Sequence, residues 1–101
     1  MKVELIIPTH DNDGSDNAVI IESAVADLCK LYGGATVYAA SGFWVNDAGR
    51  LFEDQVKVLV SAATDKDAAK AELRNLAKDI LEITDQEAVF VSVGGEAEII
   101  E

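Results

Sequence analysis

The sequence predicts an α+β domain of the ferredoxin-like βαββαβ type, in which two helices cover one face of a four-stranded, mainly antiparallel sheet. Three observations predict it. Short segments with alternating apolar residues are separated by two longer segments with apolar residues every three or four positions. Turn-forming residues lie between the segments. The 101 residues are the size of one domain, so we expect a single domain over 1–101.

The first strand is expected over residues 2–8, because Val3, Leu5 and Ile7 alternate with other residues. A polar loop, residues 10–16, follows it and offers several helix caps. The first helix is expected over 17–32 and should end at Gly33, since glycine accepts the left-handed conformation found after helices. Its apolar stripe is Ile21, Val25, Leu28 and Tyr32.

Two strands, 35–45 and 51–62, are joined by a turn signal at 46–49, which predicts a hairpin with a loop of four or five residues. Alternation in the later strand predicts one inward face. We expect that face to consist of Phe52, Val56, Val58 and Val60.

The second helix is expected from a capping signal at 64–67 to about Glu82. Its apolar stripe is Ala69, Leu73, Leu76, Ala77 and Ile80. Residues 87–93 alternate again and predict the last strand of the sheet, with Val89, Val91 and Val93 inward. The tail, residues 96–101, alternates weakly and could add a short edge strand.

Composition excludes several classes of protein. Nineteen acidic and eight basic residues give a net charge of -11, which argues against direct binding to nucleic acid or to an anionic membrane. A hydrophobic fraction of 50% is too high for a disordered acidic tail. Cys29 and His10 are the only residues of their kinds, so neither an intramolecular disulfide nor an ordinary zinc site is expected. No cofactor is predicted.

The location expected from sequence is the cytoplasm. No apolar stretch reaches the roughly 18 residues of a membrane-spanning helix, and the chain enters a strand pattern directly, without an export signal.

The sheet face away from the helices is predicted to be apolar and aromatic at its centre. Such exposed surfaces often mark interfaces, so we expect another subunit or a ligand to cover it. The alternative is an error in strand parity near Gly42, which would send Tyr38 or Trp44 into the core. The residues assigned to this face are Glu4, Ile6, Tyr38, Ala40, Trp44, Glu53, Gln55, Lys57, Leu59, Ala88, Phe90 and Ser92. The candidate ligand- or partner-binding residues among them are Tyr38, Trp44, Glu53, Lys57 and Phe90.

The acidic loop offers weak metal candidates in Asp11, Asp13 and Asp16. Its match to the calcium-loop pattern fails where Ile20 replaces the bidentate glutamate. A loop that caps the following helix is the favoured interpretation.

Glu53 has a distinctive expected setting beside Trp44 and Lys57, which fits a ligand site or a general base. A cross-strand ion pair or a role in the turn is favoured. His10 and Cys29 are not expected to form a nucleophilic pair, because Cys29 lies late in the first helix, where the helix dipole disfavours a thiolate.

Half of the cations form one ridge along the second helix, which could hold a phosphate-bearing ligand or an acidic partner. The favoured interpretation is a solvated helix face paired with acidic residues of the same helix. The ridge consists of Lys66, Lys70, Arg74 and Lys78, and the acidic residues are Asp67, Glu72, Asp79 and Glu82.

Residues 34–60 read GATVYAASGFWVNDAGRLFEDQVKVLV. This segment resembles a family of small bacterial domains of unknown function that carry a Gly-x-Trp, Gly, Glu, Lys-Val-Leu-Val pattern over a strand, a turn and a strand. The resemblance implies a ferredoxin-like sheet protein without an established activity. It implies no catalytic residue, and it marks Trp44, Gly49 and Glu53 as positions of interest.

Three functional hypotheses follow from the sequence. The first is a non-enzymatic module that forms homo-oligomers through its open sheet face and binds a small molecule or a protein partner. The second is an acidic inhibitor from a phage or mobile element that imitates nucleic acid on the basic surface of a defence or nucleic-acid-binding protein. The third, ranked lowest, is a small enzyme that uses Glu53 or a loop aspartate.

Overall fold

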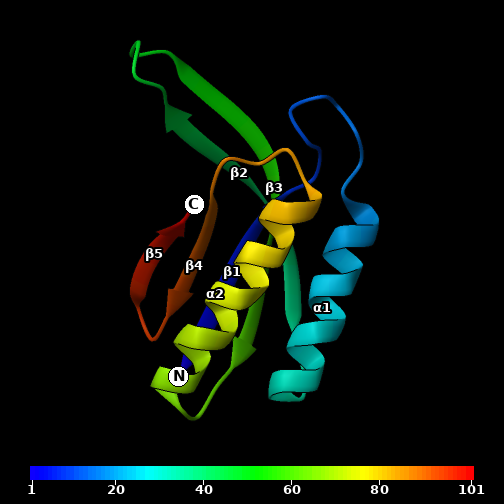
Figure 1. Cartoon of the computed structure of the whole chain (residues 1–101), viewed down its shortest axis with the longest axis vertical. Helices are drawn as coiled ribbons and strands as arrows, with labels where there is room; N and C mark the ends of the chain where they lie inside the picture. The colour runs from blue at the N-terminus through cyan, green and yellow to red at the C-terminus, as the bar shows by residue number, and fades with distance from the viewer.

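The computed structural model describes all residues, 1–101, and contains one antiparallel sheet with two helices on one of its faces (Figure 1). The sheet order is β2-β3-β1-β4-β5. The elements are β1 (Lys2–Pro8), α1 (Ala18–Tyr32), β2 (Thr36–Val45), β3 (Leu51–Ala62), α2 (Lys66–Ile83), β4 (Val89–Val93) and β5 (Glu96–Ile100).

The expected α+β class, with two helices and an antiparallel sheet, is confirmed. The expected count of four strands is wrong, because the sheet has five. The short edge strand that the tail was expected to add is present: β5 pairs with β4 along its whole length. Neither helix is both long enough and apolar enough to cross a lipid bilayer.

The core lies between the sheet and the helices. Val3, Leu5 and Ile7 of β1 have no exposed surface, and they belong to the same cluster as Leu28 of α1 and Leu73 of α2. Full burial of each such side chain stabilises the fold by about 1.5–3 kcal/mol. The periodicities expected for β1 and for both helices therefore describe the same core that the structure contains.

The helix ends follow local chemistry. Gly33 ends α1 in a left-handed conformation with φ 85°, and its N–H donates to the Cys29 carbonyl. The Asp65 carboxylate begins α2 by accepting from the Ala68 N–H at 3.1 Å. The expected capping signal is thus in the correct segment, with Asp65 as its cap.

The orientation of β3 differs from the prediction. Leu59 is completely buried beneath the helices, so Lys57, Gln55 and Glu53 share its side of the strand. The prediction that β3's inward face is Phe52, Val56, Val58 and Val60 is wrong: these four residues lie on the open face. Both sides of β3 are apolar near its middle, so alternation alone does not choose between them, and the hairpin register decides.

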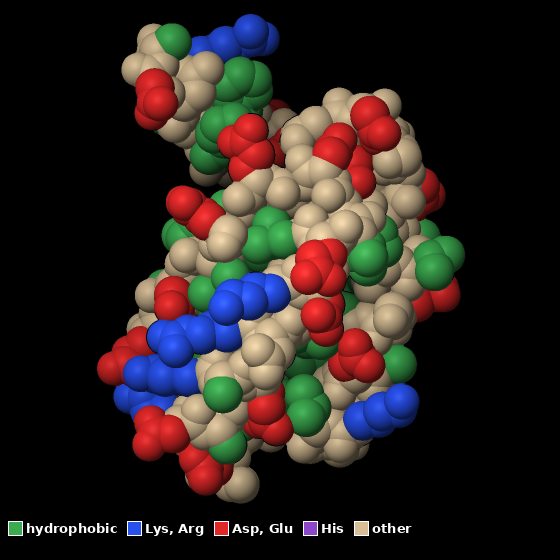
Figure 2. Space-filling model, in the orientation of Figure 1, with side chains coloured by type: hydrophobic (Ala, Val, Ile, Leu, Met, Phe, Trp, Pro, Cys, Tyr) green, Lys and Arg blue, Asp and Glu red, His purple; other side chains and the backbone are tan.

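The outer halves of β2 and β3 project beyond the helices (Figure 1). We call this projection, residues 42–54, the β2–β3 arm. It contributes to an elongated shape of 40 × 26 × 23 Å. The projection carries hydrophobic side chains together with basic and acidic ones (Figure 2).

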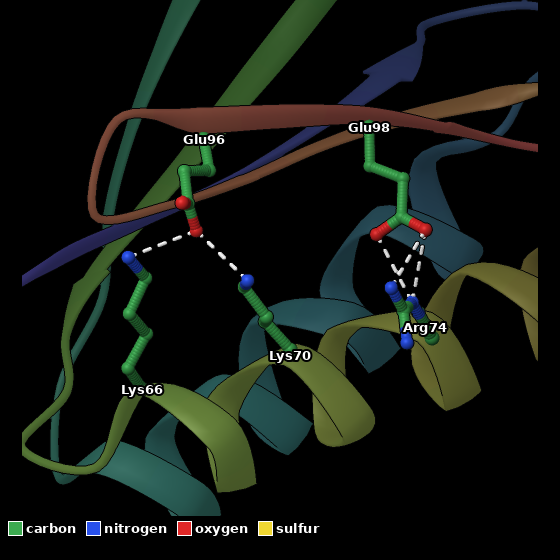
Figure 3. A network of polar contacts seen from close by, with 5 residues as sticks. All are labelled: Lys66, Lys70, Arg74, Glu96 and Glu98. Carbon is green, nitrogen blue, oxygen red and sulfur yellow. Dashed lines mark hydrogen bonds and ion pairs between the residues drawn. The ribbon is translucent and has the colours of Figure 1, made fainter.

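The basic ridge of α2 binds β5. Glu96 forms ion pairs with Lys66 at 2.9 Å and with Lys70 at 2.8 Å (Figure 3). The Arg74 guanidinium donates hydrogen bonds to both carboxylate oxygens of Glu98. The expectation that the ridge pairs with acidic residues of its own helix is therefore wrong. The spacing of charged residues within α2 does not reveal these partners, because Glu96 and Glu98 lie on β5.

Candidate functional site

An aromatic cluster lies on the open face of the arm. The rings of Trp44 and Phe52 stack with centroids 4.5 Å apart and an interplanar angle of 14°. The Arg50 guanidinium carbon lies 4.9 Å from the Phe52 ring centroid, and the Trp44 indole N–H donates to Asp54 at 3.1 Å. We call Trp44, Arg50, Phe52 and Asp54 the Trp44 cluster. Aromatic faces attract cations and stack on planar rings, so this surface suits a planar or cationic ligand.

The turn at the tip of the arm fixes the cluster. Asn46 and Arg50 are joined by a backbone hydrogen bond of 3.0 Å, and the Asn46 side-chain oxygen accepts from the N–H groups of Ala48 and Arg50. The resulting five-residue loop sets Trp44 directly opposite Phe52. Cross-strand neighbours share a face, so the turn determines which side chains meet.

Gly42 leaves space beside the cluster. It lies opposite Asp54, on the same face as Trp44. A Cβ at Gly42 would stand 3.4 Å from a methyl group of Val56 and 3.8 Å from the Asp54 carbonyl oxygen. A side chain at this position would therefore crowd the strip of surface between the Trp44 cluster and the body of the sheet.

The five predicted binding residues do not form one site. Tyr38, Trp44 and Phe90 do lie on the open face. However, Tyr38 is six residues from Trp44, which is about 20 Å along a strand. Phe90 lies on β4, with β3 and β1 between it and β2.

The placement of Glu53 and Lys57 beside Trp44 is wrong, because both side chains lie on the opposite side of β3. They take no part in the ion pairs of the structure, so the favoured ion-pair role is not seen. Sequence reasoning missed Phe52 and Asp54. Counting outward from the centre of the turn would have placed Phe52 opposite Trp44.

The acidic loop meets a residue that the sequence did not indicate. Carboxylate oxygens of Asp11, Asp13 and Asp85 all lie within 4.8 Å of one another. The third metal candidate, Asp16, lies elsewhere and accepts from the Ala18 N–H at 2.7 Å, at the start of α1. Asp85 follows α2 and is 74 positions from Asp11, so no local motif reveals the group.

Hydrogen bonds within the protein account for this acidic group. The Asp85 carboxylate accepts from the N–H groups of Asn12 and Asp13, at 2.8 and 3.0 Å. Asp11 accepts from Asn17 at 2.9 Å and from Gln86 at 3.1 Å. Partial burial acts to raise the pKa of Asp11, but these hydrogen bonds outweigh it and lower that pKa. The group is a latch between the loop and the turn after α2.

A hollow of about 560 Å³ opens beside the end of α1 and the start of β2, with Tyr32, Gly34 and Ser61 in its lining. Its volume is within the range of small-ligand sites. Two of its hydroxyl groups already have partners: Ser61 donates to the Gly34 carbonyl at 2.7 Å and Tyr32 donates to Glu72 at 3.1 Å. Burial and the neighbouring Glu72 raise the pKa of Tyr32, which keeps its hydroxyl neutral. The hydroxyl groups of Tyr32 and Ser61 are therefore already engaged within the protein.

The chain resembles two solved structures of phage SAM lyase. One is described as the lyase in complex with S-methyl-5'-thioadenosine; it matches with a TM-score of 0.74 and 15% identity, over 98% of this chain and 87% of that chain. The other is the lyase in its apo state, with a TM-score of 0.69 and 15% identity over 97% and 84% of the two chains. No protein-family model and no curated protein matches the sequence.

These matches correct the functional expectations. Both neighbours are lyases, which contradicts the first hypothesis of a non-enzymatic module, and the acidic-inhibitor hypothesis fits them no better. Nothing in the composition indicates a lyase, because net charge reports on the surface and not on the reaction. The resemblance of residues 34–60 to small bacterial domains stays a prediction, since no family model matches.

Proposed function

We propose that this protein is a lyase that binds SAM, S-adenosylmethionine, and releases S-methyl-5'-thioadenosine. The observation that carries the proposal is the likeness of 98% of the chain, at a TM-score of 0.74, to a phage SAM lyase in complex with that compound. In this proposal the Trp44 cluster binds the ligand. It combines the exposed Trp44 ring and the half-buried Phe52 ring with a carboxylate on the sheet face that the helices leave open.

The chemistry of SAM fits this surface. SAM carries a sulfonium cation close to a planar adenine. The half-exposed Trp44 ring offers a face for stacking or for a cation–π contact, which contributes about 0.5–2 kcal/mol. The Asp54 carboxylate, held by the indole N–H, adds an opposite charge near that ring. A net charge of -11 also raises the local concentration of a cationic ligand.

Cleavage changes the charge that this surface recognises. When the bond between sulfur and the methionine chain breaks, its electron pair stays on sulfur and the sulfonium becomes a neutral thioether, while the substrate's own carboxylate oxygen forms a bond to the carbon that the sulfur leaves, so that the methionine chain departs as a lactone. The leaving group needs no proton from a general acid. Attraction to the sulfonium alone gives binding without acceleration, so in this proposal the rate increase comes from holding the methionine chain in a reactive conformation. The neutral product binds more weakly and leaves.

The test is a measurement of S-methyl-5'-thioadenosine by chromatography and mass spectrometry after incubation with SAM. We expect product above the spontaneous rate. Asp54→Ala and Trp44→Ala are each expected to lower kcat/KM about tenfold or more, the equivalent of about 1.4 kcal/mol. Glu53→Ala is the matched control, because Glu53 is the adjacent carboxylate on the opposite side of β3 and should leave kcat/KM unchanged. Product at the spontaneous rate only would contradict the proposed activity.

A second variant tests the location. Gly34 borders the hollow beside α1, and a Cβ built there meets no atom within 4 Å. Gly34→Leu therefore adds an apolar side chain at the border of the hollow, from a Cβ that has open space around it. We expect this variant to retain activity. Loss of activity in Gly34→Leu together with full activity in Trp44→Ala would assign the ligand to the hollow.

A further inference from the structure

The positive charge of Arg50 has no partner within the protein. Its guanidinium takes part in no ion pair and in no side-chain hydrogen bond, and its carbon lies 4.9 Å from the Phe52 ring centroid. An arginine side chain stays charged in proteins and carries five N–H donors in a planar group. The contact with the Phe52 ring leaves these donors free for an anion.

The turn of the arm holds Arg50 in place. Its N–H donates to the Asn46 side-chain oxygen at 2.9 Å, and its carbonyl accepts from the Asn46 N–H at 3.0 Å. Arg50 is also the only Lys or Arg residue of the β2–β3 arm. Lys2, which lies on the open face at the far end of β3, opposite Ala62, is already paired with Glu4 at 3.2 Å. The Trp44 cluster therefore contains the unpaired cation of the open face.

The cluster presents two opposite charges around one aromatic stack. Arg50, Phe52 and Asp54 follow one another along the same face of β3, about 7 Å apart. The positive group contacts Phe52, and the negative group accepts from the Trp44 indole N–H at 3.1 Å. A ligand that covers the stack therefore meets both charges. SAM carries a complement for each part, since it has a carboxylate, a sulfonium and a planar adenine.

We propose that Arg50 binds the carboxylate of the substrate and thereby selects sulfonium compounds that carry a carboxylate. This inference rests on the proposed function. Guanidinium groups bind carboxylates through two parallel N–H···O bonds, which fix orientation as well as affinity. A protein of net charge -11 repels an anionic group over most of its surface, so the unpaired cation makes the cluster the place that accepts one.

The same contact orients the reacting atoms. During cleavage one carboxylate oxygen forms a bond to the carbon that the sulfur leaves, and the bond between that carbon and sulfur breaks with its electron pair on sulfur. Arg50 that donates to the other oxygen keeps the attacking oxygen close to this carbon. The lactone that departs has no carboxylate, so Arg50 binds the substrate and does not retain this product.

The test compares SAM with decarboxylated SAM, which keeps the sulfonium and the adenine and lacks the carboxylate. The emission of Trp44 measures the affinity for each compound. We expect the wild type to bind SAM about fivefold more tightly, the usual upper value for an exposed ion pair. Arg50→Gln should abolish this preference and leave the affinity for decarboxylated SAM unchanged, whereas damage to the cluster would weaken both. Arg50→Lys keeps the charge and should restore part of the preference.

The matched control is Lys30→Gln, which removes the same charge from an exposed, unpaired residue of α1 and should keep the full preference. Equal affinities in the wild type, no binding of either compound, or a preference that survives in Arg50→Gln would overturn the inference. The proposed activity is judged separately, by product formation. SAM turnover without the preference would contradict the role of Arg50 alone, and the preference without turnover would contradict the lyase activity alone.

Discussion

Trp44 and Phe52 stack face to face across the β2–β3 arm, with ring centroids 4.5 Å apart. Such a pair stabilises its two strands by about 0.5–1.5 kcal/mol beyond simple burial. The stack holds together an arm that projects past the helices, and it leaves Trp44 48% exposed. One contact therefore both orders the arm and presents an aromatic ring to a ligand.

The fluorescence of Trp44 should report ligand binding directly, because it is the only tryptophan. We expect a saturable change in its emission when SAM is added. S-methyl-5'-thioadenosine should produce a similar change with weaker affinity, since it lacks the sulfonium charge that Asp54 and the ring attract. Asp54→Asn should reduce the difference in affinity between the two compounds, and Glu53→Gln is the control. Equal affinities in the wild type would argue against charge recognition at this cluster.

The aromatic cluster shows where sequence reasoning stops. Alternation predicts both ends of β3 correctly but gives its faces in reverse, because Val56 and Val58 on one side and Leu59 on the other are all apolar. The register of the arm, set by the five-residue loop after Val45, decides the orientation. The sequence predicts Trp44 as a binding residue, whereas the same alternation places its partner Phe52 in the core.

The sequence also does not predict which residues from distant segments contact one another. Asp85 joins Asp11 only because the turn after α2 lies beside the loop after β1. The basic ridge of α2 was visible as a pattern, yet its partners Glu96 and Glu98 lie on a strand of which only a weak alternation was seen. Local periodicity predicts where a helix or a strand lies in the sequence. It does not predict which helices and strands contact one another, which is known only from the folded structure.

Leu73 of α2 should be among the residues most sensitive to truncation. It has no exposed surface and packs in the cluster formed by both helices and the sheet. We expect Leu73→Ala to lower the free energy of unfolding by about 2–5 kcal/mol, measured by urea denaturation. Ile83→Ala, on the same helix but 62% exposed, is the control and should cost less than about 1 kcal/mol. Similar losses in the two variants would contradict the assigned core.

The contacts of Asp85 should contribute both to the stability of the whole protein and to the order of the loop after β1. Asp85→Ala removes the acceptor of the Asn12 and Asp13 N–H groups, so we expect a loss of about 1–2 kcal/mol and faster hydrogen exchange in the loop after β1. Asp85→Asn keeps one side-chain oxygen, so its stability should lie between those of the wild type and Asp85→Ala. Asp79→Ala, which removes an exposed carboxylate on α2, should leave loop exchange unchanged. Wild-type exchange at residues 12 and 13 in Asp85→Ala would show that the latch does not order the loop.

The ion pairs of Glu96 should make the attachment of β5 depend on pH. Lys70 and Lys66 hold the pKa of Glu96 at about 2, below its ordinary value of 4.5. A lowered folded-state pKa contributes stability that is complete above the ordinary value and is lost as the pH falls through the folded value. Glu96→Gln should therefore melt below the wild type at neutral pH by a margin that shrinks between pH 4.5 and pH 2. The margin should be small, because the pair is exposed to solvent, and smaller still in high salt. Glu101→Gln, outside the ion pairs, is the control, and a Glu96→Gln margin that stays constant down to pH 2 would show that these pairs do not hold β5.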